Sequence, residues 1–150
     1  MNAEYKHTQF GAITLAVFLL TGILAAYIIL SMLADGRLLV ALITTGLYLL
    51  IVALFYAFTI EVSEGKLKFW FGIRAISKSY SLGEIQSTQE VENPWYYLWG
   101  IKSIPGGWLY AIAPGSAVEI VFRNSKIIRL GSNQPKELKQ ALDEAISVSS

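Results

Sequence analysis

Two long apolar runs without a single charge constrain this chain more than any other feature. They cover residues 10–33 and 38–60, and only residues 34–37 separate them. Because an α-helix rises about 1.5 Å per residue, each run is roughly 35 Å long, slightly more than a hydrocarbon core of about 30 Å. We therefore predict a transmembrane hairpin, preceded by an N-terminal tail (1–9) and followed by a small domain (61–150).

We interpret both runs as transmembrane helices and do not interpret the first as a signal peptide that is cleaved off. The first run is longer than the core of about 7 to 15 residues of a signal peptide, and the second run follows it at once. No Pro, His, Lys, Arg, Asp or Glu interrupts either run. Ion pathways and transporter sites usually contain such residues within the membrane, so transport by this chain alone is disfavoured.

Small residues within the two runs can be understood in two ways. They are common in membrane helices in general, or they form the faces through which the two helices pack closely. The second interpretation involves Ala12, Ala16, Gly22 and Ala26 in the first run and Gly46, Ala53 and Ala57 in the second.

The basic residues favour an orientation with both ends of the chain in the cytoplasm, because cytoplasmic flanks of membrane helices carry an excess of Lys and Arg. Arg37 is the only basic residue of the connecting loop. The opposite flanks contain Lys6, Lys66, Lys68, Arg74 and Lys78. We therefore predict a multi-pass protein of the cell (cytoplasmic) membrane with its termini and its domain in the cytoplasm.

Beyond the second run, the hydrophobic pattern changes from helical to alternating, which is typical of β-strands. Residues 93–108 contain two prolines and three glycines, and we interpret them as an ordered loop rich in aromatic residues. A single amphipathic helix begins near Pro135. The alternation predicts seven strands, at 57–62, 66–71, 76–82, 86–92, 109–113, 117–122 and 126–130.

Composition excludes several classes of function. The net charge is +1 and Lys plus Arg nearly equal Asp plus Glu, which does not favour nucleic-acid binding. The chain has no cysteine, and His7 is its one histidine, so we expect no histidine-based triad, metal site or cofactor. Residues 100–103 contain Gly-Lys-Ser letters without the spacing of a phosphate-binding loop. We predict that the chain is not an enzyme.

Several short motifs stand out in the second half of the chain. They are Asn93-Pro94-Trp95-Tyr96-Tyr97, Trp99-Gly100-Ile101, Pro105-Gly106-Gly107-Trp108-Leu109-Tyr110, Ala117-Val118-Glu119-Ile120, and Arg129-Leu130-Gly131 with Pro135. These motifs resemble those of the bacterial PH-like (bPH) domain membrane proteins, a family whose two-helix members are largely uncharacterised, and the resemblance covers residues 85–142. It implies an α+β membrane protein in which the transmembrane hairpin precedes a seven-stranded PH-like β-barrel or sandwich that is closed by the C-terminal helix.

Two groups of side chains are candidate contact sites. The aromatic residues of the loop could fill the core of the domain, lie at the headgroup level of the membrane, or bind a partner. The basic residues could bind lipid headgroups, although a solvated strand face also accounts for them and Glu61 and Glu64 dilute their charge. The aromatic group comprises Trp95, Tyr96, Tyr97, Trp99 and Trp108; the basic group comprises Lys66, Lys68, Arg74 and Lys78.

These observations predict a membrane-anchored binding or assembly module without catalytic activity of its own. Its expected partners are the lipid bilayer and a membrane protein or a second copy of the chain, and tethering would raise its effective concentration near them. The alternatives are a non-catalytic subunit of a transport or membrane-enzyme complex, and a domain that senses lipid headgroups.

Overall fold

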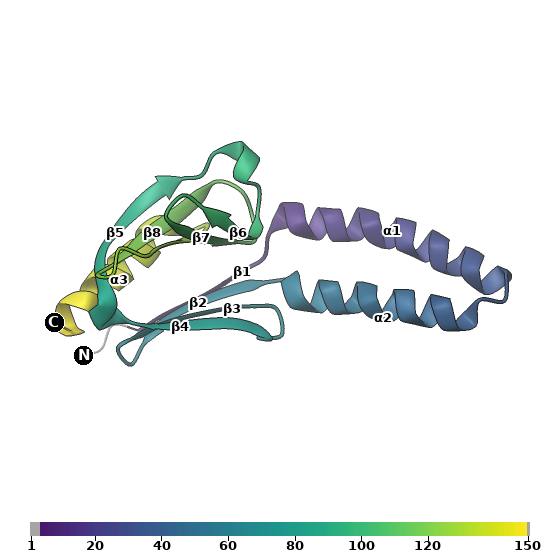
Figure 1. Ribbon diagram of the computed structural model, residues 1–150, viewed down its shortest axis with the longest axis horizontal. Helices are drawn as coiled ribbons and strands as arrows, with labels where there is room; N and C mark the ends of the chain where they lie inside the picture. The colour runs from purple at the N-terminus through teal and green to yellow at the C-terminus, as the bar shows by residue number, and fades with distance from the viewer. Residues whose placement is uncertain (1–3, 150) are drawn as a thin grey trace.

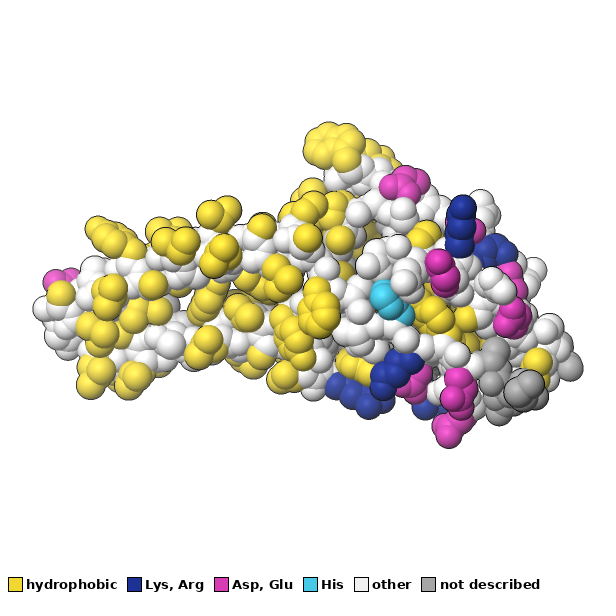
Figure 2. Space-filling model, turned by 180° about the vertical axis from the view of Figure 1, so that it is seen from behind, with side chains coloured by type: hydrophobic (Ala, Val, Ile, Leu, Met, Phe, Trp, Pro, Cys, Tyr) yellow, Lys and Arg dark blue, Asp and Glu magenta, His cyan; other side chains and the backbone are white. Residues whose placement is uncertain are grey.

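A β domain stands at one end of two long antiparallel helices in the computed structural model, which describes residues 4–149 (Figure 1). Helices α1 (Ala12–Ala34) and α2 (Leu38–Phe55) are long and apolar enough to cross a membrane, and only 6% of either candidate span is buried. Figure 2 shows hydrophobic side chains covering both helices. The two predicted apolar helices are therefore present and expose the surface that a lipid environment favours.

Helix α2 is shorter than the apolar run that predicted it. It ends at Phe55, and strand β2 (Phe58–Ser63) begins within residues 38–60. Phe58 and Ile60 are buried in the core of the domain. The prediction that the second span extends to residue 60 is therefore wrong, because the inward face of β2 is as apolar as the helix that precedes it.

The N-terminal tail also belongs to the domain. Strand β1 (Tyr5–Gln9) pairs antiparallel with β2, with Tyr5 opposite Val62 and Gln9 opposite Phe58. Neighbouring antiparallel strands are usually joined by a short turn. Here the whole helical hairpin takes the place of that turn, so the two apolar helices are an insertion between two paired strands.

The domain is a sandwich of two sheets with one C-terminal helix. The first sheet has the order β1-β2-β3-β4 and the second has the order β5-β8-β9-β7-β6, in which β7 and β9 are parallel. The remaining elements are β3 (Lys66–Phe71), β4 (Ile76–Ser81), η1 (Leu82–Glu84), β5 (Ile85–Glu92), η2 (Trp95–Tyr97), β6 (Gly100–Ile104), β7 (Gly107–Ala111), β8 (Ser116–Phe122), β9 (Ile127–Gly131) and α3 (Pro135–Ser149).

Residues 4–149 contain nine strands, whereas the sequence pattern predicted seven. The additional strands are β1, in the predicted tail, and β6, in the predicted loop 93–108. Strand β6 pairs with β7 from Gly100 to Ile104, and Pro105 lies just beyond it, where its missing N–H disturbs no ladder.

The core lies between the sheets and is closed by α3, which packs against β2, β5, β8 and η1. Leu138, Leu142 and Ala145 form the buried stripe of α3, as its amphipathic pattern predicted. The helix thereby covers apolar side chains that two open sheets would leave in water. The largest buried side chains of the sheets are Phe58, Ile60, Leu67, Phe69, Phe71, Leu109, Ile120, Ile128 and Leu130.

Within the hairpin, the helices meet at one of the predicted small residues. The Tyr48 hydroxyl donates a hydrogen bond to the Phe18 carbonyl, and a methyl group at Gly22 would lie 2.9 Å from the Tyr48 oxygen. Gly46, in contrast, has no atom within 4 Å of the position a Cβ would take. Of the predicted small residues, Gly22 lies at this contact, but it faces the side chain of Tyr48. Four others, Ala12, Ala16, Ala26 and Gly46, are exposed, so the close-packing prediction is wrong for them.

Candidate membrane-facing site

The end of the domain next to the helices is fixed to both of them. At α1, the Thr14 hydroxyl donates a hydrogen bond to the Ile112 carbonyl oxygen, which follows β7. Gly11 lies against the same carbonyl, and a Cβ at this position would be 2.4 Å from its oxygen. Only glycine permits this close approach between the start of α1 and the domain.

At α2, the turn between β3 and β4 lies against the end of the helix. The Ile73 N–H donates to the Ala53 carbonyl at 3.1 Å, and the Gly72 N–H donates to the Ala57 carbonyl at 2.8 Å. With a hydrogen-bonded junction at each helix, the domain has a fixed orientation relative to the spans.

Exposed aromatic and apolar residues surround these junctions. Phe10 stacks on Tyr56 beside the two helix ends, with 6.3 Å between the ring centroids. Ile73, in the β3–β4 turn, is 58% exposed. Aromatic residues are favoured where a membrane meets water, so these side chains suit the level at which two membrane-crossing helices would meet the headgroups.

The structure divides the predicted aromatic group. Trp95 and Tyr96 are 81% and 61% exposed. Tyr97 and Trp99 instead pack on a small cluster of the second sheet that is formed by Ile104, Leu109 and Ala111. Internal packing therefore accounts for Tyr97 and Trp99, whereas Trp95 and Tyr96 face outward.

Trp108 lies apart from that loop. It lies near the start of β7, opposite Ser103, whereas Ala111 at the other end of the strand approaches α1. At about 3.3 Å per residue, three residues separate the two levels by roughly 10 Å. Trp108 is therefore farther from the helices than Gly100 and Ala111, which lie next to Trp99.

A strained residue orients the exposed pair. Leu98 has a φ of +53°, which is uncommon for a residue with a side chain. It follows the short helix η2 and reverses the chain before β6, so that the tip of η2 projects away from the sheet. Figure 2 shows an apolar projection at the edge of the domain nearest the helices.

The four predicted basic residues line one groove on the outer face of the first sheet. The groove has a volume of about 280 Å³. Arg74 stacks over Trp70, with its guanidinium carbon 4.1 Å from the ring centroid. Figure 2 shows Lys and Arg side chains gathered on the domain close to the helices. The groove is lined by Lys66, Lys68, Trp70, Arg74, Ser77, Lys78 and Ser79.

The carboxylate of Glu61 reduces the number of free charges in the groove. A hydrogen bond from Ser63 lowers the pKa of Glu61, and the nearby charges of Lys6 and Lys68 lower it further against the opposing effect of burial. The ammonium nitrogen of Lys68 lies 3.7 Å from carboxylate oxygens of both Glu61 and Glu64. Lys68 is thus ion-paired with two carboxylates and is not available to bind another anion.

Three of the predicted basic residues remain without a carboxylate partner. Among residues 4–149, Lys66, Arg74 and Lys78 form no ion pair. Arg74 and Lys78 lie at the end of the groove that adjoins the β3–β4 turn and the end of α2. The positive charge available to an anion is therefore concentrated near the helices.

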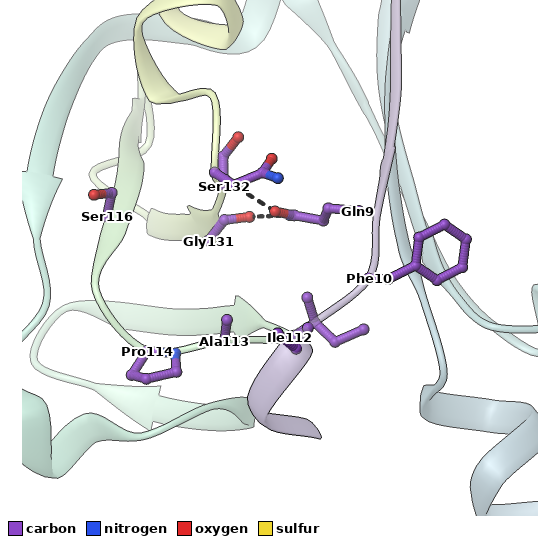
Figure 3. A pocket seen from close by; sticks show the side chains of 11 residues that line it. Gln9, Phe10, Ile112, Ala113, Pro114, Ser116, Gly131 and Ser132 are labelled. Carbon is purple, nitrogen blue, oxygen red and sulfur yellow. Dashed lines mark hydrogen bonds between the residues drawn. The ribbon is translucent and has the colours of Figure 1, made fainter. Parts of the chain in front are cut away.

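A second cavity, of about 380 Å³, lies where β1 enters α1 (Figure 3). Its main polar group, the buried Gln9 amide, donates a hydrogen bond to the Gly131 carbonyl at 2.6 Å and accepts one from the Asn133 N–H at 2.9 Å. These bonds join β1 to the end of β9. Gln9 therefore holds the two sheets together beside the start of α1.

Sequence reasoning missed this contribution of the N-terminal segment. Tyr5, His7 and Gln9 point to one side of β1, but they are too polar to give the apolar alternation of a buried strand. His7 is also engaged, since its Nε2 lies 2.8 Å from Asn133 Oδ1. The sequence signal for this strand was the position of Tyr5, His7 and Gln9 at alternate residues.

Two tyrosines inside the domain have shifted pKa values. Burial raises the pKa of Tyr110 and, together with the charge of Glu137, that of Tyr5. Residues 4–149 contain no group of three or more His, Asp or Glu side chains placed to hold a metal ion.

Comparisons with protein-family models, curated proteins and solved structures found no match to this chain.

Proposed function

We propose that the chain is a membrane-anchored binding or assembly module without catalytic activity, which displays a PH-like β domain at the cytoplasmic face of the cell membrane. A two-sheet sandwich covered by a C-terminal helix supports the PH-like assignment. The parallel pair β7–β9 departs from the purely antiparallel sheets expected for such a domain. The proposal therefore depends on how the domain is mounted rather than on its family.

The observation that carries this proposal is the pair of hydrogen-bonded junctions at Thr14 and at Gly72–Ile73. A flexible linker would only raise the local concentration of the domain near the bilayer. A rigid mount also presents the same edge of the domain to every neighbour in the membrane, which lowers the entropic cost of binding.

The distribution of charge supports the cytoplasmic orientation. The loop at the far end of the helices contains Asp35 and Arg37, whereas Lys6, Arg74 and Lys78 lie at the domain end. Positive residues are retained on the cytoplasmic side.

The edge that we propose for partner binding is the tip of η2. Trp95, Tyr96 and Leu98 are all exposed there. Aromatic residues carry much of the binding free energy in protein interfaces because they bury a large area and lose little conformational entropy. The proposed partner is an integral membrane protein with an apolar surface at the same level.

Crosslinking in native membranes tests the partner. A photoreactive phenylalanine analogue at position 96 is expected to give a stoichiometric protein adduct, and Trp95→Ala is expected to reduce its yield at least fivefold because the neighbouring anchor is removed. The measurement is the mass and yield of the adduct on a gel and by mass spectrometry.

Trp108→Ala is the matched control, because it removes the same side chain from the far end of β7 and should leave the yield unchanged. Adducts with lipid alone would instead place Trp95 and Tyr96 in the headgroup layer. An adduct with a second copy of the chain would make the module self-assembling. An equal loss with both substitutions would contradict a specific contact at the tip of η2.

A second candidate function, recognition of anionic lipid headgroups, is favoured by the groove that gathers Lys66, Arg74 and Lys78. Arginine and lysine bind phosphate oxygens through charge-assisted hydrogen bonds. A basic cluster next to a membrane attracts anionic lipids by about 1 kcal/mol per residue. The stacking of Arg74 on Trp70 holds its guanidinium close to the groove.

The full chain in nanodiscs of equal phosphatidylglycerol and phosphatidylcholine tests headgroup recognition. We expect native mass spectrometry to show preferential retention of phosphatidylglycerol, and the double substitution Arg74→Ala and Lys78→Ala to reduce that preference at least threefold. Lys136→Ala, which removes an exposed charge from α3, is the control. An unchanged preference in the double variant would eliminate this groove as the site.

A further inference from the structure

An apolar pocket lies between the two helices and the domain, on the domain side of the contact at Tyr48. Its volume is about 240 Å³. Helix α1 contributes Thr14, Val17 and Phe18 to the lining, and α2 contributes Ile51 and Phe55. The domain closes the pocket with Phe71, Trp99, Gly100, Ala111 and Ile112.

The pocket lies within the outermost part of the spans. Val17 follows the start of α1 at Ala12 by five residues, or about 8 Å, and Ile51 precedes the end of α2 at Phe55 by four residues, or about 6 Å. The stacked pair Phe10 and Tyr56 lies on the water side of this level. This is the depth at which the acyl chains of a phospholipid begin.

Water is a poor occupant of this pocket. Two side chains of the lining carry a polar atom, Thr14 and Trp99, and Thr14 already donates its hydroxyl to the Ile112 carbonyl. A buried water needs two to four polar partners, and an empty apolar cavity loses the dispersion contacts that would line it. The pocket therefore favours an apolar occupant.

The lipid phase is the continuous source of such an occupant. Val17 and Ile51 line the pocket and are 38% and 50% exposed, so the pocket is open along both helices. The lining thus continues without a polar break into the surface that faces lipid. A flexible acyl chain can enter from the side and follow the diverging helices toward the domain (Figure 1).

Trp99, which lines the domain side of the pocket, carries an indole N–H that can donate a hydrogen bond. Its ring packs on the domain, yet among residues 4–149 its indole N–H donates no hydrogen bond. Trp side chains at membrane interfaces usually pair an apolar body with a hydrogen bond from this N–H. The ester carbonyl of a phospholipid provides an acceptor next to the first carbons of the chain.

We propose that this pocket holds one acyl chain of a phospholipid from the leaflet on the domain side, with its ester carbonyl accepting a hydrogen bond from Trp99. The bound lipid would fill the opening between α1, α2 and the domain. This inference requires the helices to lie in a bilayer, but it depends neither on a protein partner nor on the choice of headgroup.

The test measures lipid retained by the full chain after transfer from nanodiscs to native mass spectrometry. The unmodified chain is expected to keep one phospholipid. The double substitution Val17→Phe and Ile51→Phe fills the pocket from the lipid side and is expected to lower retention at least fivefold. Leu24→Phe with Leu47→Phe, two equally lipid-exposed positions outside the pocket, should leave retention unchanged.

Trp99→Phe separates the hydrogen bond from the ring. This variant keeps the apolar contact and should retain the lipid with a dissociation rate raised about threefold. Thermal unfolding of every variant checks that the domain is intact, and a photoreactive leucine analogue at position 17 identifies the occupant directly. The mass of its adduct should be that of a phospholipid.

Three results would overturn the proposal: no lipid retained by the intact chain, equal retention by the filled variant and its control, or an adduct between positions 17 of two chains. Headgroup preference is measured separately with the Arg74 and Lys78 variant, so an unchanged preference in that variant with retention of one lipid by the intact chain would reject the groove and leave the pocket. A reduced preference in that variant with equal retention by the pocket-filled variant and its control would reject the pocket alone.

Discussion

A fragment that begins at Glu61 will not unfold cooperatively, whereas a chain in which an Asn-Gly turn joins Gln9 to Phe58 will. The fragment lacks β1 and the first half of β2, including Phe58 and Ile60, which are both buried in the core. The joined chain keeps both strands in register, because Gln9 and Phe58 are opposite each other and Asn-Gly is a favoured two-residue hairpin turn.

Denaturant unfolding followed by tryptophan fluorescence and far-ultraviolet circular dichroism distinguishes the two chains. The joined chain should show a single sigmoidal transition in both signals, and the fragment should show a broad, non-cooperative change. A cooperative transition of the fragment at the same midpoint would mean that β1 adds nothing to the domain. Detergent is included for both, since the edge that faces the helices becomes exposed.

Gly72→Ala will destabilise the junction between the domain and α2 by roughly 3 kcal/mol or more. A methyl group there would lie 2.0 Å from the Ala53 carbonyl oxygen, and the backbone φ is +43°. The positive φ alone costs a residue with a side chain about 1 to 2 kcal/mol. Displacing packed backbone adds about 1 to 3 kcal/mol.

Gly65→Ala is the matched control, because Gly65 has a φ of +71° but no atom within 4 Å of the position that a Cβ would take. It should lose only the conformational cost of about 1 to 2 kcal/mol. The measurement is the free energy of unfolding in nanodiscs, with amide exchange of residues 72–75 as a local probe. Equal losses for the two variants would show that the β3–β4 turn is not pressed against α2.

The two long apolar helices could be predicted from the sequence because neither segment contains any charge. The end of the second helix could not be fixed, because residues 57–60 fitted both the apolar run and the strand predicted at 57–62. Phe58 and Ile60 are buried in protein rather than in lipid, and both environments select the same side chains. Strand β1 escaped prediction for the opposite reason, since its inward residue Gln9 is polar and buries its amide in hydrogen bonds.

The candidate sites were predictable to the extent that they depend on local spacing. Lys66 and Lys68 alternate on β3, Arg74 lies in the turn that follows, and Lys78 lies on β4, so their shared groove follows from one β-hairpin. The aromatic group instead depends on tertiary packing. Nothing in the sequence separates Trp99, which packs on the second sheet, from Trp95, which is exposed.

The insertion of the two apolar helices between β1 and β2 links assembly of the domain to synthesis of the helices. During synthesis β1 emerges first and has no neighbour until the helices have been made, and the contact of Gln9 with Gly131 spans 122 positions in sequence. A nascent chain that stops before β2 keeps the unpaired edge of β1 open to aggregation or proteolysis. The first sheet therefore closes only after both helices have left the ribosome.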